Sequence, residues 1–148
     1  MEAHERALAS IPISDLNGYE VGRIHFVAAD VGIFARYIEV QCDFQAVFAS
    51  LKGVRINPDG SGADAASEAI VDAAEQQFAE LIDRVCGVKT SESAFVRFRP
   101  FASLRGGVLW ADIVVKALNE TRKAVQKNIE QLDKKYGNRK RGKKYGRK

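Results

Sequence analysis

The stretch VLWADIVVKALNETRKAVQKNIEQLDKKY, residues 108–136, predicts one long helix. Its apolar residues recur at three- and four-residue steps, the spacing that places side chains on one face of a helix. The first half is apolar nearly all round, whereas the second half is polar outside the stripe. We therefore expect the first half to lie in the core and the second half to project and offer its stripe to a partner. The residues predicted to bind that partner are Val114, Leu118, Val125, Ile129 and Leu132.

A second helix is predicted over residues 64–86, DAASEAIVDAAEQQFAELIDRVC. Asp64 is a favourable N-cap residue, and Gly87 readily adopts the left-handed conformation that ends many helices. Acidic residues at helical spacing indicate a solvated outer face, made of Glu68, Asp72, Glu75, Glu80 and Asp83. The buried stripe is predicted to comprise Ile70, Ala74, Phe78, Leu81 and Val85.

Asp30 and Gly53 are expected to bound an earlier helix, VGIFARYIEVQCDFQAVFASLK, as its N-cap and C-cap. One apolar face of this helix contains Ile33, Tyr37, Val40, Phe44, Val47 and Leu51. The next segment, VRINPDGSGAD (residues 54–64), carries the Asn, Pro, Asp and Gly residues typical of turns. Its Gly60-Ser61-Gly62 sequence is expected to make this loop flexible.

A β-hairpin is predicted near the N-terminus, because Asn17-Gly18 is a strong turn signal between apolar segments. Pro12 is expected at the edge of the hairpin, since proline has no backbone N–H to donate. The predicted fold is mainly α: a small domain of three to four helices with this short hairpin. Residues 1–10 are expected to be flexible, 11–133 to form the single helical domain, and 134–148 to form a disordered basic tail.

The composition is that of an ordinary globular protein, with 148 residues of which 46% are hydrophobic and 28% charged. No apolar run approaches the ~20 residues that cross a bilayer. The first residues, MEAHERALASIPIS, lack the apolar segment of a secretory signal. The expected location is therefore the cytoplasm, with no membrane partner.

The sequence does not predict an enzyme, because it holds only two histidines and two cysteines. A side-chain nucleophile needs a base within reach, and His4 and His25 do not offer one that can be placed beside a nucleophile. No Cys/His spacing suits a metal, and Cys42 and Cys86 are interpreted as free and partly buried. No catalytic, cofactor-binding or metal-binding residue is predicted.

The C-terminal tail, KKYGNRKRGKKYGRK, holds nine of the 23 Lys and Arg residues and none of the 19 acids. Residues 1–133 therefore carry 14 positive and 19 negative charges, a net of −5. Basic residues interleaved with Tyr are typical of arms that bind phosphates and stack on bases, but also of solvated extensions that contact an acidic partner. The residues that would make either contact are Lys134, Lys135, Arg139, Lys140, Arg141, Lys143 and Lys144.

The order of these elements resembles the tail assembly chaperones of long-tailed (siphovirus-type) bacteriophages. The resemblance covers about residues 15–141. It comprises a β segment before a helix (IHFVAAD, FARYIEV), an acidic helix (DAAEQQFAELIDRVCG), a Phe-rich turn ending in Gly-Gly (FRPFASLRGG) and a long helix with a Lys/Asn/Arg-rich end. The sequence departs from the family where Arg97, Arg99 and Arg105 replace acidic residues of the turn, and in a longer loop at 53–65.

The resemblance implies a helical assembly factor, made in the host cytoplasm, that binds the tape measure protein and helps to recruit tail tube subunits. Self-association is left open. Two alternatives also remain: a small nucleic-acid-binding protein acting through residues 134–148, and a structural phage component such as a connector or tail completion protein.

Overall fold

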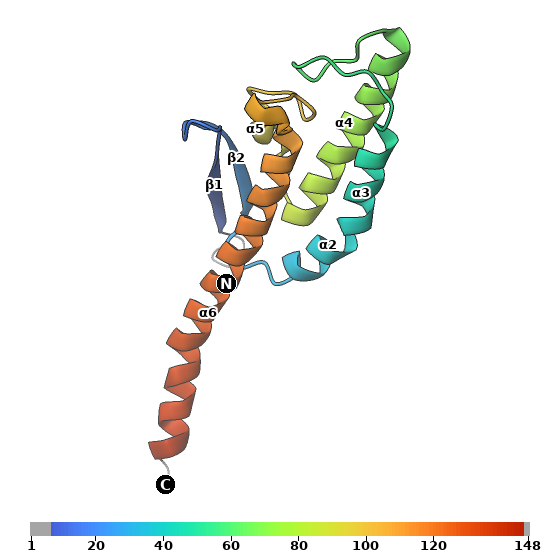
Figure 1. Cartoon of the computed structure of the whole chain (residues 1–148). Helices are drawn as coiled ribbons and strands as arrows, with labels where there is room; N and C mark the ends of the chain where they lie inside the picture. The colour runs from blue at the N-terminus through green and yellow to red at the C-terminus, as the bar shows by residue number, and fades with distance from the viewer. Residues whose placement is uncertain (1–6, 147–148) are drawn as a thin grey trace.

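The computed structural model describes residues 7–146, and their side chains through Tyr136. It confirms the predicted fold class: a mainly helical chain with a two-stranded antiparallel hairpin at its start (Figure 1). The elements are β1 (Leu8–Ser14), β2 (Glu20–Val27), α2 (Ile33–Glu39), α3 (Gln41–Ser50), α4 (Ala65–Cys86), α5 (Ser91–Ala94), the 3₁₀ turn η1 (Arg105–Gly107) and α6 (Trp110–Gly146).

The hairpin closes through the predicted Asn17-Gly18 turn. Asp15 Oδ1 accepts hydrogen bonds from the backbone N–H groups of Asn17 (2.9 Å) and Tyr19 (3.0 Å), and Gly18 has a φ of +85°. β1 begins at Leu8, so the expectation of a flexible segment over residues 1–10 is wrong for its last three residues. They are ordered because they pair with β2, with Leu8 opposite Val27.

The predicted first helix is in fact two helices, α2 and α3, which meet at Val40. Its apolar face is confirmed: Tyr37 is half-buried and the other five predicted residues are buried. The N-cap is Gly32 rather than Asp30. The Asp30 carboxylate instead forms an ion pair with Arg36, whose guanidinium also donates to the carbonyl oxygens of Arg84 (2.9 Å) and Val85 (3.1 Å). Arg36 thereby places positive charge at the C-terminal end of α4, where it stabilises the helix dipole.

Both predicted ends of α4 are confirmed. Asp64 Oδ1 accepts a hydrogen bond from Ser67 N–H (2.8 Å), and Gly87 ends the helix with a φ of +72°. The predicted buried stripe holds except at Ile70, which is 43% exposed, because the neighbouring Val71 occupies the core position.

The core is aromatic at its centre. The Phe78 ring lies 5.2–5.8 Å from the rings of four other phenylalanines, Phe44, Phe48, Phe95 and Phe101. Trp110, at the start of α6, is fully buried and donates its indole N–H to Ala94 O (2.9 Å). α6 therefore joins the hairpin and the other helices into one core, as predicted for its first half.

The segment 54–64 packs against residues 98–104, so its expected flexibility is wrong. Ser103 N–H donates to Pro58 O (2.8 Å), and Gly62 N–H donates to Glu68 Oε1 (2.9 Å). A Cβ on Gly60 would lie 2.8 Å from the backbone N of Ala102. The glycines of this loop thus permit close packing of two backbones.

α6 continues to Gly146, beyond the predicted end near Tyr136 and into the segment predicted to be disordered. Lys and Arg favour helices, and positive charge near a helix C-terminus is stabilising. Among residues 7–146, no helix has the length and apolarity to cross a membrane.

Candidate functional site

The apolar stripe of α6 is divided between the core and the surface. Val114, Leu118 and Val125 are fully buried in the chain's own core. Their prediction as partner-binding residues is therefore corrected, because they have no surface to offer in this fold. Sequence periodicity identified the stripe but not the point at which the rest of the chain stops covering it.

Beyond Val125 the stripe emerges from the body of the protein. Ile129 is half-buried, Leu132 is 44% exposed and Tyr136 is 50% exposed. Figure 1 shows the reason, since α6 extends well past the hairpin and the other helices. We call Ile129, Leu132 and Tyr136 the exposed stripe. Tyr136 was not predicted, although it follows Leu132 by four residues and Ile129 by seven, which are helical spacings.

Polar contacts fix the base of the projecting half of α6. Asn128 Nδ2 donates to Ala28 O (2.8 Å), which ties the helix to the segment that follows β2. On α2, the Tyr37 ring lies 5.3 Å from the Arg122 guanidinium carbon, in a cation–π arrangement. The same post-β2 segment carries Val31, which is 68% exposed. These contacts with the post-β2 segment and with α2 therefore fix the position of α6 where the exposed stripe begins.

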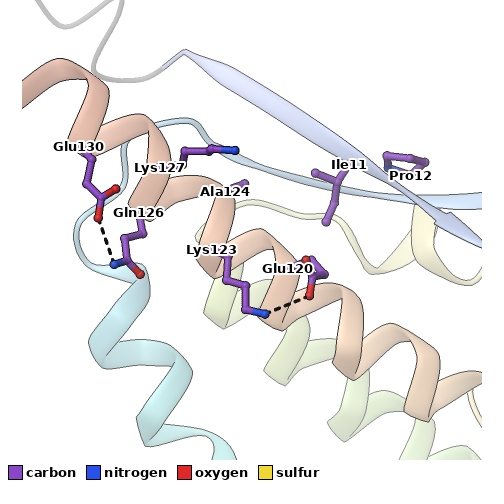
Figure 2. A pocket seen from close by; sticks show the side chains of 8 residues that line it. All are labelled: Ile11, Pro12, Glu120, Lys123, Ala124, Gln126, Lys127 and Glu130. Atoms are coloured by element: carbon purple, nitrogen blue, oxygen red, sulfur yellow. Dashed lines mark hydrogen bonds and ion pairs between the residues drawn. The ribbon is translucent and has the colours of Figure 1, made fainter. Parts of the chain in front are cut away.

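A shallow groove of about 640 Å³ lies between β1 and another side of α6 (Figure 2). Its apolar lining is small, with Ile11 and Pro12 from β1 and Ala124 from α6. Polar side chains on α6 are paired within the groove: Lys123 forms an ion pair with Glu120 (3.5 Å), and Gln126 Nε2 donates to Glu130 Oε2 (3.2 Å). Four of the five long polar side chains in the groove are thus paired, and only Lys127 has no hydrogen bond or ion pair with the described side chains.

The acidic face of α4 serves a structural purpose that the sequence interpretation missed. Arg99, which follows α5, donates to Glu75 Oε2 (2.8 Å) and Glu68 Oε1 (3.1 Å) and lies 3.4 Å from Asp72 Oδ1. The hydrogen bonds with Glu75 and then Glu68 raise the pKa of the Arg99 guanidinium. Three of the five predicted solvated acids thus attach the 98–104 segment to α4.

The N-cap and the first turn of α4 each hold a carboxylate with a lowered pKa. The pKa of Glu68 lies below its usual 4.5, chiefly because Gly62 N–H and then Arg99 donate to it. The pKa of Asp64 lies below its usual 3.8 because Ser67 N–H donates to it. In both cases the folded state favours the ionised form.

We expect the protein to lose stability as the pH falls below about 4.5, because the unfolded chain then binds protons that the folded chain resists. Glu68→Gln should lower stability near neutral pH and flatten this decline. Urea unfolding midpoints between pH 3 and 7 measure both effects. Glu80→Gln, on the same helix, is the matched control, since Glu80 has no hydrogen bond or ion pair with the described side chains. An identical pH dependence for Glu68→Gln and the unmodified protein would contradict the assignment.

Neither cysteine is part of a reactive arrangement in the described region. Cys86 is buried, and burial raises the pKa of its thiol to about 12, which keeps it protonated at neutral pH. Cys42 is exposed rather than partly buried, and both are free. The half-buried His25 donates its backbone N–H to Thr90 Oγ1 (2.7 Å). Within residues 7–136, no three His, Cys, Asp or Glu side chains are grouped as a metal site would require.

The predicted basic contact residues lie at the far end of α6. Lys134 and Lys135 are exposed, and Lys135 Nζ lies 5.7 Å from the centre of the Tyr136 ring. The backbone from residue 137 to 146 is helical. The side chains of the other predicted contact residues, Arg139, Lys140, Arg141, Lys143 and Lys144, lie outside the described ones.

Comparison with known proteins found no matching family model, curated protein or solved structure.

Proposed function

We propose that this protein is an assembly factor that binds a helical segment of another protein through the exposed stripe of α6. One observation carries the proposal: the stripe that is buried in the body continues along a projecting helix, where Leu132 and Tyr136 are exposed. An amphipathic helix with an uncovered apolar face is a common means of binding a partner helix.

The exposed stripe is suited to a specific but modest interaction. Burying a Leu or aromatic side chain contributes about 1.5–3 kcal/mol, and about half of each side chain is still available at Leu132 and Tyr136. Tyr is enriched among the residues that dominate binding energies, because its ring is large and loses little conformational entropy.

The partner that we propose is the tape measure protein of a phage or prophage tail, with tail tube protein as a further candidate. The support is the resemblance of the element order to tail assembly chaperones, together with a long C-terminal helix. A chaperone for an elongated helical client needs an accessible apolar stripe and no active site. The projecting half of α6 supplies such a stripe.

Co-expression with the tape measure protein encoded in the same genome tests this function. We expect the two proteins to co-purify at moderate salt, and Leu132→Gln/Tyr136→Gln to abolish co-purification because it removes both exposed apolar groups. Ile70→Gln on α4 is the matched control. Its exposed fraction, 43%, is similar to the 44% of Leu132, but Ile70 lies on another helix. Failure of the folded, unmodified protein to co-purify would overturn the proposal, as would equal recovery with the double variant.

Nucleic-acid binding is the second candidate, and the concentration of nine positive charges after Asp133 favours it. Phosphate binding by these residues would weaken steeply as salt increases and would be lost on truncation after Asp133. It would not depend on Leu132. The two functions can therefore be distinguished in two ways: by how steeply binding weakens with salt, and by whether Leu132→Gln weakens binding.

A further inference from the structure

We infer that the partner segment bound by the exposed stripe is an acidic amphipathic helix, with carboxylates flanking its apolar face. This inference rests on the proposed function and adds the charge of the partner to it. The inference is based on one observation: the exposed stripe and a strongly basic segment follow each other on one projecting helix, whereas residues 1–133 carry a net negative charge.

Charges of both signs flank the described part of the stripe, and positive charge follows it. Lys135 Nζ lies 5.7 Å from the centre of the Tyr136 ring, whereas Asp133 lies beside Leu132, and Lys134 is two residues from both stripe residues and so faces away from them. Seven residues beyond Leu132 and Tyr136, two helical turns on, the sequence has Arg139 and Lys143. A partner helix lying along α6 would therefore pass from an apolar region to a cationic one. Carboxylates on that helix would gain favourable interactions, whereas Lys or Arg there would be repelled.

A second copy of this chain is a poorer source of those carboxylates. Most acids of the body are already engaged: Glu68, Asp72 and Glu75 with Arg99, and Asp30 with Arg36. Among the described side chains, the carboxylates with no hydrogen bond or ion pair to another described residue are spread over four different helices: Glu39, Glu80, Glu92, Asp112 and Asp133. Parallel pairing of two α6 helices would also bring two segments of nine positive charges together. The partner's acids are therefore expected from another protein.

The test uses the full-length protein and two synthetic amphipathic peptides of about 20 residues, long enough to form several helical turns. Both have the same Leu stripe; one has Glu beside the stripe and the other has Gln. We expect the Glu peptide to bind about tenfold more tightly at low salt, with most of this advantage lost near 1 M salt, where the Debye length is about 3 Å. Leu132→Gln/Tyr136→Gln should weaken both peptides, and Ile70→Gln neither.

The outcomes separate the two proposals. Equal affinity for the Glu and Gln peptides, with both lost in Leu132→Gln/Tyr136→Gln, would overturn the acidic partner and leave helix binding intact. If the double variant binds the Glu peptide as tightly as the unmodified protein does, both the acidic partner and helix binding by the exposed stripe would be overturned. If duplex DNA binds tightly and displaces the peptide while being insensitive to the double variant, the tail is a nucleic-acid arm and the inference fails. A dimer that dissociates only when the double variant is introduced would identify a second copy as the occupant, which also overturns it.

Discussion

Phe78→Ala is expected to destabilise the protein by about 3–5 kcal/mol. Phe78 is fully buried on α4, and its ring is surrounded by four phenylalanine rings that come from α3, from the C-cap of α5 and from the segment 98–104. Truncation would remove the contacts that hold these elements together and leave a cavity that close packing cannot fill. The expected loss is a large part of the 5–15 kcal/mol that stabilises a typical domain.

Urea and thermal unfolding measure this effect, with an expected fall in melting temperature on the order of 10 °C. Val96→Ala is the control, because Val96 is 74% exposed and surface truncations usually change stability by less than ~0.5 kcal/mol. A loss below about 1 kcal/mol for Phe78→Ala would mean that the aromatic cluster does not form the centre of the core.

Local sequence signals predicted the elements of this fold well where a residue's own conformational or hydrogen-bonding preference determines its position, as at helix caps and tight turns. Asp64 and Gly87 bound α4 as predicted, and Asn17-Gly18 forms the hairpin turn. Periodicity also identified the buried faces of α2, α3 and the first half of α6. These signals depend on contacts within a few residues, which a sequence displays directly.

What the sequence could not reveal depends on residues that are distant along the chain. Glu68, Asp72 and Glu75 look solvated until Arg99, 24 to 31 residues later, is placed against them. The apolar residues from Ile33 to Leu51 keep a continuous helical spacing, so the sequence does not indicate the break between α2 and α3 at Val40. For the candidate site, the stripe was predictable, but its division at Val125 depends on where the body ends.

Gly62→Ala is expected to destabilise the protein by about 3 kcal/mol. The reason is a steric overlap, and not the positive φ that commonly requires glycine. A Cβ at this position would overlap the backbone N and Cα of Glu68, in the first turn of α4. Relief would require the 54–64 loop to move away from the helix, and the hydrogen bond from Gly62 N–H to Glu68 would be lost. Gly106 is the opposite case, with a φ of +79° and, outside residues 105–107, no atom within 4 Å of where its Cβ would lie.

Asparagine distinguishes the two reasons, because it tolerates positive φ better than alanine but has the same Cβ. At Gly106, alanine should destabilise by about 1–2 kcal/mol and asparagine by clearly less, since only the backbone conformation is unfavourable. At Gly62, alanine and asparagine should be equally harmful, because both introduce the overlapping atom. Urea unfolding of the four variants makes the comparison. Recovery with asparagine at Gly62 would show that backbone conformation, rather than close packing of the loop on α4, requires glycine there.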